Sequence, residues 1–216
     1  MKIRIAITGV GVVSSAGIGK EAFWNSLLNG VPENGFLIED FDPLPFFDGN
    51  AKEARRADRF QQLALAAAKE AIDQAGDFVI DPTAVGTMIG TGVGGLGTLE
   101  NQVKVFLDKG PRRVSPFLVP MMMANAASAS VSMTYGFQGP CETIVTACAA
   151  GTHSIGRAAE LIRSGKIKAM VAGGAEATLT PIGTQGFVNM TAVSKEGISR
   201  PFDTQRDGFM QSEGAG

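Results

Sequence analysis

The chain has 216 residues, 44% of them hydrophobic and 19% charged, and its formal net charge at pH 7 is −2. This length suits one sizeable α/β core, and the small net charge gives no signal for a nucleic-acid or a membrane partner, so we expect neither. With two cysteines, no disulfide framework and no signal-peptide pattern, the expected compartment is the cytoplasm.

The first part of the chain contains four predicted features. Isoleucines alternate with other residues over positions 3–7, which predicts an opening strand that runs into a glycine turn. Residues 20–28 are expected to form a helix. Residues 33–51 carry prolines, glycines and acids without periodicity, which indicates a surface excursion. The clearest helix covers residues 60–75, where apolar side chains recur at helical spacing until Gly76 ends the pattern.

The rest of the chain alternates strands and helices. In order we expect a strand at 85–89, a glycine loop at 90–97 with a helix ending at 107, a helix at 119–135, a strand at 144–147, a helix ending near 164 and a strand at 169–172. This alternation predicts a mainly parallel mixed sheet with helices on both faces. Residues 207–216 look like the start of a further strand without an apolar continuation.

The glycine loop has the spacing of a nucleotide-binding motif. Residues 92–97 read Gly-Val-Gly-Gly-Leu-Gly after a predicted strand and before a helix, the context of the dinucleotide fingerprint. That fingerprint also requires an acidic residue about twenty positions later, where this chain has Pro116, Phe117 and Leu118. A nucleotide-binding protein is therefore the last of the interpretations that we keep open.

Cys148 is the candidate for covalent chemistry. It lies between a predicted strand and the small-residue turn at 149–152, which opens a helix. A helix start presents unpaired backbone N–H groups and a partial positive charge, and both favour the thiolate, the nucleophilic form of cysteine. The alternative is a small buried residue that fills a tight corner between strand and helix.

The sequence around this cysteine, Thr-Ala-Cys-Ala-Ala-Gly-Thr-His at 146–153, resembles the active-site turn of the β-ketoacyl-acyl-carrier-protein synthases, condensing enzymes of the thiolase superfamily. Six further segments resemble type II members of that family in the same order: 9–14, 55–60, 110–117, 172–176, 199–203 and 206–209. The resemblance implies a thiolase-like layered α/β fold. Residues 1–216 would be its N-terminal ketoacyl synthase domain, truncated before the C-terminal half.

The resemblance also implies an acyltransferase of fatty-acid elongation. Cys148 would take an acyl group from acyl carrier protein, its own N–H would supply part of the oxyanion hole, and the acyl-cysteine would be condensed with malonyl-acyl-carrier-protein. Two family histidines stabilise the developing negative charge, but this chain has one, His153, which matches a structural histidine of the motif. This chain alone is therefore expected to be inactive. No cofactor or metal is implied, and the full-length protein is expected to be a homodimer.

Binding residues are also implied by the resemblance. Val93 and Leu118 match positions that line the acyl channel near the dimer interface, and core packing is the alternative for both. The positions that match carrier-protein contacts are basic, and their alternative is a solvated face: Lys52, Arg55, Arg56, Arg112 and Arg113. Two departures weaken this surface, because Thr191 stands where the family often has arginine and the link at 194–198 is short.

Two further interpretations stay open beside the fatty-acid synthase. The first is a polyketide ketosynthase of the same superfamily, which the sequence separates poorly from it. The second is a non-catalytic fragment that serves as an assembly or binding module. The missing histidines favour this module for the chain as it stands, whereas the presence of Cys148 favours an active parent protein.

Overall fold

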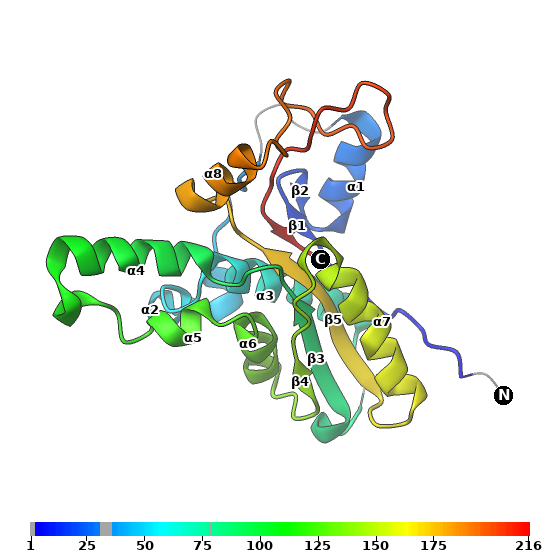
Figure 1. Cartoon of the computed structure of the whole chain (residues 1–216). Helices are drawn as coiled ribbons and strands as arrows, with labels where there is room; N and C mark the ends of the chain where they lie inside the picture. The colour runs from blue at the N-terminus through cyan, green and yellow to red at the C-terminus, as the bar shows by residue number, and fades with distance from the viewer. Residues whose placement is uncertain (1–2, 31–35, 78) are drawn as a thin grey trace.

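The structure is a computed structural model that describes residues 3–30, 36–77 and 79–216. Within these residues the strands form a six-stranded sheet in the order β2-β1-β6-β5-β3-β4 (Figure 1). The strands are β1 Val13–Ser14, β2 Gly17–Ile18, β3 Val85–Gly90, β4 Cys141–Glu142, β5 Ala169–Glu176 and β6 Gly214–Ala215. β3 runs parallel to β4 and β5, whereas β6 is antiparallel to β5 and β1, and β1 is antiparallel to β2. The predicted mixed sheet is confirmed, and its parallel part is the β4-β3-β5 half.

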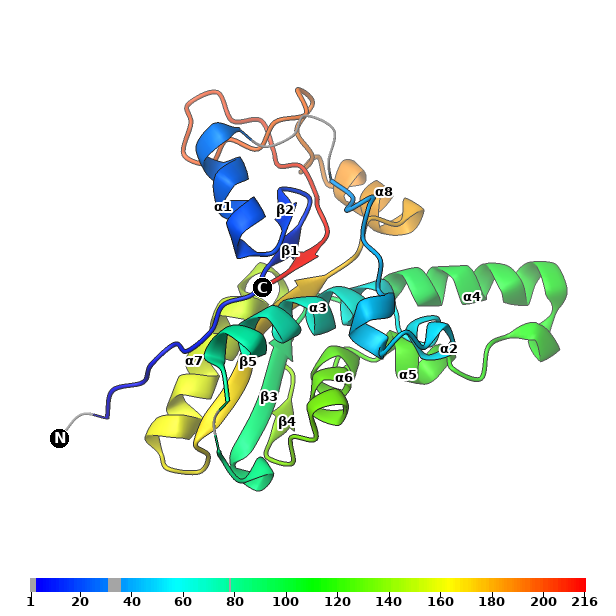
Figure 2. The same cartoon turned by 180° about the vertical axis from the view of Figure 1, so that it is seen from behind.

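Helices cover both faces of this sheet, as predicted. The α-helices are α1 Lys20–Asn29, α2 Ala51–Ala54, α3 Arg59–Ala75, α4 Leu96–Lys109, α5 Leu118–Met122, α6 Ala126–Tyr135, α7 Ala150–Arg163 and α8 Pro181–Asn189. Short 3-10 helices are η1 Leu44–Phe47, η2 Pro82–Ala84, η3 Pro111–Arg113 and η4 Ala147–Ala149. α7 packs on β3 and β5 from one side, and α3 and α6 pack from the other (Figures 1 and 2). None of the described helices is both long and apolar enough to cross a membrane.

α3 is the central helix of the core, and its sequence explains both of its ends. A capping box starts it, because the Asp58 carboxylate accepts the Phe60 N–H and Gln61 accepts the Asp58 N–H. Gly76, with φ 72°, ends it. Phe60 and Leu63 are fully buried between these ends, together with a run of small alanines. These small side chains let the sheet and α6 approach closely, which confirms the predicted helix.

α7 lies directly on the sheet because two glycines leave room for it. A Cβ on Gly90 of β3 would lie 2.5 Å from the Ala150 carbonyl oxygen, and one on Gly174 of β5 would lie 3.0 Å from the Gly151 Cα. Ala150, Ser154, Ala158 and Leu161 form the buried stripe of the helix at i, i+4, i+8 and i+11. The amino end of α7 is therefore held at the carboxyl end of the parallel strands.

The predicted opening strand at 3–7 is wrong. Residues 3–12 form no strand, and Ile7 is 82% exposed. The next part of this segment bonds to α3 instead, since the Val10 and Val12 N–H groups donate to the side chains of Gln74 and Glu70. Alternating isoleucines form a strand only where they pair with another strand, and residues 3–7 pair with none of the described strands.

Two other expectations also need correction. The helix expected at 119–135 is two helices, because Met123 after α5 is extended, with ψ 135°, and the Met122 carbonyl accepts the Gly95 N–H from the glycine loop. The excursion at 33–51 is only partly on the surface: Ile38 and Phe41, at 6% and 8% exposure, belong to the main core. Residues 33–35 of that excursion lie outside the described residues.

The end of the chain enters the sheet. β6 pairs with both β5 and β1, and Gly216 exchanges two backbone hydrogen bonds with Gly174. The predicted strand is therefore confirmed only at residues 214–215, whereas residues 207–213 are irregular apart from one bridge between Val193 and Phe209. Pairing on both sides makes β6 an interior strand of the described sheet.

Candidate active site

Cys148 lies in η4, a single turn between β4 and α7. β4 ends at Glu142, so the predicted strand at 144–147 is wrong, although the Thr91 N–H still donates to the Ile144 carbonyl over 3.2 Å. Next to the cysteine, Ala147 has φ 51°, in the left-handed region that residues with a Cβ seldom adopt. The cysteine therefore follows a strained residue and comes two residues before the first residue of α7.

The side chain of Cys148 is exposed. The interpretation of this residue as a buried corner-filler is therefore wrong. The neighbouring N–H groups of Ala149 and Ala150 bond back to Thr146 and Ala147, but among the described residues no acceptor is found for the Cys148 N–H itself. The turn thus presents an accessible sulfur next to a free backbone donor, the combination that an acyl-accepting nucleophile requires.

His153 supports this turn from the helix. Its Nδ1 lies 2.8 Å from the Thr146 hydroxyl oxygen, and Thr146 is two residues before Cys148. Within the described chain, no hydrogen bond joins this imidazole to the sulfur. The geometry agrees with the structural role that the family motif implies for this histidine.

Glu176, at the end of β5, binds the glycine loop near the turn, and its role was not predicted. Its Oε2 accepts the Gly92 N–H at 2.7 Å and the Thr91 hydroxyl at 3.2 Å. Burial is the main influence on this carboxyl and raises its pKa above the ordinary value, against hydrogen bonds that lower the pKa. The only sequence signal was its position at the end of the family segment 172–176, which does not indicate what the carboxyl contacts.

The glycine loop is not built for a pyrophosphate. Three N–H groups that could bind phosphate already have protein acceptors: Gly92 donates to Glu176, Gly95 to the Met122 carbonyl and Thr98 to the Asp58 carboxylate at 3.0 Å. Asp58 is buried, so it also puts a negative charge at the amino end of α4, where a phosphate would bind. The nucleotide-binding interpretation of this loop is therefore wrong.

Of the two residues implied for the acyl channel, Val93 is the nearer in sequence to a contact with the cysteine turn, the one at Gly92. Val93 is 54% exposed and follows Gly92, whose position lies against Ala147: a Cβ built there would be 3.7 Å from the Ala147 Cα. Core packing is therefore wrong for Val93. Leu118 is partly buried at the start of α5, which meets the glycine loop at its other end through Met122. The link from Leu118 to the turn is therefore indirect.

The five predicted carrier contacts lie on two segments. Lys52 and Arg55 are exposed on or just after α2, and Arg112 and Arg113 are exposed on η3. Arg56 already has partners within the chain: it forms an ion pair with Glu53 at 2.7 Å, and its guanidinium lies 4.1 Å from the centre of the Phe117 ring. This last contact joins the α2 segment to the chain that follows η3.

The two departures from the family pattern lie near α8. Thr191 is exposed and has φ 56°, just after the end of α8. The short link at 194–198 is organised by Asp207, whose carboxylate accepts the Ser194 hydroxyl and the Lys195 N–H, each at 2.7 Å. These hydrogen bonds also lower the pKa of Asp207 below its ordinary value. One carboxylate thus sets the shape of a link that has no helix or strand.

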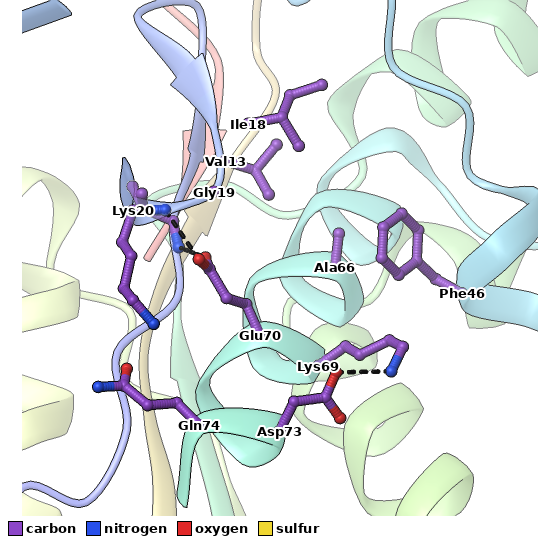
Figure 3. Close-up of a pocket in the computed structure, with 11 residues that line it drawn as sticks. Val13, Ile18, Gly19, Lys20, Phe46, Ala66, Lys69, Glu70, Asp73 and Gln74 are labelled. Carbon is purple, nitrogen blue, oxygen red and sulfur yellow. Dashed lines mark hydrogen bonds and ion pairs between the residues drawn. The ribbon is translucent and has the colours of Figure 1, made fainter. Parts of the chain in front are cut away.

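A hollow of 490 Å³ lies between α3 and the β1–β2 hairpin, away from the cysteine (Figure 3). The charged side chains that line it already have partners. Glu70 accepts the N–H groups of Val12 and Lys20, and Lys69 forms an ion pair with Asp73. Within the described residues no group of three or more histidine, cysteine or acidic side chains is arranged to hold a metal ion. The candidate site therefore remains the turn that carries Cys148.

Comparison with known proteins agrees with this geometry. The model of the β-ketoacyl synthase N-terminal domain matches residues 32–216. The chain belongs to the β-ketoacyl synthase family. Its predicted fold, the N-terminal half of a thiolase-like layered α/β structure, is confirmed.

Relatives in the family show how much of such a protein this chain represents. It is 40% identical to 3-oxoacyl-[acyl-carrier-protein] synthase 2 of Synechocystis sp., over 100% of this chain and 56% of the relative. The synthase 2 of Staphylococcus aureus (strain MRSA252) is 42% identical, over 99% of this chain and 56% of the relative. The chain therefore spans a little over half the length of these curated relatives.

A solved structure extends the comparison to three dimensions. The AntDE:AntF complex is a type II PKS acyl-carrier protein with its ketosynthase bound to the hexaketide. One of its chains matches this structure with a TM-score of 0.79 and 27% identity, over 97% of this chain and 55% of that chain. The similarity therefore extends over nearly the whole described fold.

Proposed function

We propose that this chain is the N-terminal half of a β-ketoacyl-acyl-carrier-protein synthase and carries its acyl-accepting nucleophile, Cys148. The observation that carries the proposal is the exposed sulfur beside an unbonded N–H, on the turn between β4 and α7. The names of the relatives, which are 3-oxoacyl-[acyl-carrier-protein] synthases, support the same chemistry.

In the first step the Cys148 thiolate attacks the carbonyl carbon of an acyl thioester on the carrier protein. A bond forms between the sulfur and that carbon, and the bond to the carrier's pantetheine sulfur breaks. The pantetheine thiolate leaves and takes up the proton that Cys148 gave up. The Cys148 N–H would donate to the carbonyl oxygen while it carries negative charge.

The second step belongs to the complete protein. Malonyl-acyl-carrier-protein loses its carboxylate as CO2, and the resulting enolate carbon attacks the acyl-cysteine carbonyl. The new carbon–carbon bond releases the Cys148 thiolate and leaves a β-ketoacyl product on the carrier. The family resemblance assigns the stabilisation of the enolate to two histidines beyond residue 216, so residues 1–216 alone would be inactive in this step.

Acyl carrier protein is the proposed partner. The exposed basic side chains on α2 and η3 support this choice, since charge of opposite sign speeds the encounter with an acidic carrier. The AntDE:AntF ketosynthase, which the chain resembles, is itself bound to an acyl-carrier protein. The family resemblance further supports a cytoplasmic homodimer for the complete protein.

A polyketide ketosynthase is the second candidate function, and the similarity to AntDE:AntF is the observation that favours it. The identity to that ketosynthase is 27%, whereas the identity to the synthases 2 is 40–42%. The fatty-acid pathway is therefore the better supported of the two. Product analysis with saturated acyl carriers and with polyketide-type acyl carriers separates them.

Acylation of the complete natural protein tests the proposal. After incubation with acyl-acyl-carrier-protein, intact mass should rise by one acyl group, and peptide mapping should locate it on Cys148. Cys148→Ala should abolish the mass increase, while Cys141→Ala, at the other exposed cysteine of the chain, should keep it. Absence of any acyl adduct in the wild-type protein would support the non-catalytic assembly module instead.

A further inference from the structure

Glu176 occupies a place that the proposed chemistry leaves unexplained. It is the last residue of β5, at the carboxyl end of the parallel strands, and it meets the backbone that follows β3. One carboxylate oxygen accepts the Gly92 N–H and the Thr91 hydroxyl. The other oxygen is buried, and within the described residues it has no hydrogen-bond partner. A buried polar atom without a partner is costly, so a reason for a carboxylate at this position is required.

The reason lies in the second neighbour of Gly92, Ala147. A Cβ built on Gly92 would lie 2.8 Å from the Glu176 Oε2 and 3.7 Å from the Ala147 Cα. The carboxylate and the residue that precedes Cys148 thus both lie close to Gly92. A side chain at position 92 would push the carboxylate oxygen away, so glycine lets Oε2 come this close.

Ala147 needs such support. Its φ of 51° is unusual for a residue with a side chain, and strain of this kind persists only where the surroundings hold the backbone in place. The bond between His153 and Thr146 holds one end of the turn. Gly92 lies close to Ala147 itself, and its N–H is fixed by Glu176.

We propose that Glu176 is a positioning residue for Cys148: its carboxylate anchors the Gly92 N–H, keeps this backbone against Ala147 and so holds the turn that presents the sulfur. The inference rests on the proposed function, because it assigns a role in acyl transfer. The Thr91 hydroxyl, which also accepts the Gly94 N–H at 3.2 Å, extends the same anchor to both residues that flank Val93. Glu176 thus links the nucleophile to the implied acyl-channel residue.

The chain offers a matched control for this role. Glu70 on α3 is also a glutamate whose carboxylate accepts two donors, the N–H groups of Val12 at 3.0 Å and Lys20 at 2.8 Å. It holds the β1–β2 hairpin (Figure 3), and its helix α3 packs on the side of the sheet opposite α7 (Figures 1 and 2). Loss of Glu70 should therefore weaken the fold without a specific effect on Cys148.

The experiment compares Glu176→Ala, Glu176→Gln and Glu70→Ala in the complete natural protein. The first measurement is the rate of iodoacetamide alkylation at Cys148 relative to Cys141, followed peptide by peptide, since both cysteines are exposed. The second is kcat and KM for acyl transfer. Glu176→Ala should lower the alkylation ratio about tenfold and kcat ~10- to 100-fold with KM unchanged, because misplacement of a reacting group acts on the chemical step.

The other two variants separate positioning from general stability. Glu176→Gln should retain the alkylation ratio within about threefold, because its amide oxygen still accepts the Gly92 N–H. Glu70→Ala should lower the melting temperature and leave the ratio unchanged. The inference is overturned if Glu176→Ala leaves or raises the ratio, if Glu176→Gln loses as much as alanine, or if Glu70→Ala lowers the ratio equally.

Failure of the proposed function gives a different result. If Cys148 takes no acyl group in the wild-type protein, the acyltransferase proposal fails, but the alkylation ratio still reports whether Glu176 positions the turn. If acylation proceeds normally in wild type and in Glu176→Ala alike, the positioning role fails and the acyltransferase proposal stands.

Discussion

The two halves of the sheet are held together by different interactions. In the parallel half, every residue of β3 is buried, and helices pack on both faces of β3 and β5. In the antiparallel half, β6, β1 and β2 have two residues each, and the segments are tied down by carboxylates. The parallel half is therefore stabilised by apolar burial along continuous elements, whereas the antiparallel half depends on single charged residues that are distant in the sequence.

Two glutamates show this dependence. Glu213, buried just before β6, accepts the Ile38 N–H at 2.9 Å and pairs with the Arg59 guanidinium at 2.8 Å. Glu70 ties the β1–β2 hairpin to α3 by two further backbone bonds. Cys148 follows β4 of the parallel half, and Glu176 lies where that half meets β6. The candidate site therefore combines the buried parallel strands with a carboxylate at the boundary between the two halves.

The largest expected effect comes from the apolar core that both halves share. Leu63→Ala should lower the free energy of unfolding by about 3 kcal/mol, because Leu63 is 0% exposed and the substitution leaves a cavity in the main core, beside α3. Leu107→Ala is the control, since Leu107 on α4 is 74% exposed and its loss should cost under ~0.5 kcal/mol. Urea unfolding measures both, and a similar cost for the two would contradict the assignment of the core.

The antiparallel half should respond to loss of one carboxylate. Glu213→Ala should cost about 2 kcal/mol, because it leaves the Ile38 N–H without an acceptor and the partly buried Arg59 with only the Ile38 carbonyl as a partner. Hydrogen exchange at the Ile38 amide should accelerate more than exchange in β3. Glu160→Ala removes an exposed carboxylate paired with Arg157 on α7 and should cost under ~0.5 kcal/mol. Equal costs for both substitutions would contradict the proposed difference between the halves.

The parallel half should respond to added volume. Gly90→Ala would put a methyl 2.5 Å from the Ala150 carbonyl and 2.7 Å from the Ser154 hydroxyl, so α7 must move away from β3. The expected cost is about 1–2 kcal/mol, with slower alkylation of Cys148. Gly156→Ala on the same helix meets nothing within 4 Å and should stabilise by ~0.5 kcal/mol. Thermal unfolding of the two variants measures both changes in stability. A stabilised Gly90→Ala would contradict the close packing of α7 on β3.

The smallest effect is the pH dependence that Glu176 contributes. Burial raises its pKa above 4.5, so the folded chain holds this proton more tightly than the unfolded chain. The resulting stability is fully present below pH 4.5 and is lost as pH rises through the folded-state pKa. Glu176→Gln does not titrate, so wild type should lose stability relative to this variant as pH rises from 4.5 through the raised pKa of Glu176. Urea midpoints across that range test the sign, and a relative gain for wild type would contradict it.

Local sequence was enough to predict the elements that have both a clear apolar pattern and clear signals at their ends. α3 has a capping box, a buried stripe and a terminal glycine, and β3 is a short apolar run between turns, so both could be predicted. The isoleucines at 3–7 have an equally clear alternation, but the alternation says nothing about whether a strand edge is available. The break after Met122 also escaped prediction, because the Gly95 N–H that bonds to this residue lies in a separate loop.

At the candidate site, the sequence by itself predicted which residue carries the chemistry: the motif around Cys148 points to this cysteine, and its exposed position agrees with that prediction. Tertiary structure alone decided how it is held, through the strained Ala147, the His153 to Thr146 bond and the Glu176 anchor on Gly92. The physical reason is that an apolar pattern reports burial one element at a time, whereas a carboxylate acts on whichever backbone N–H the fold brings within 3 Å, here 84 residues away.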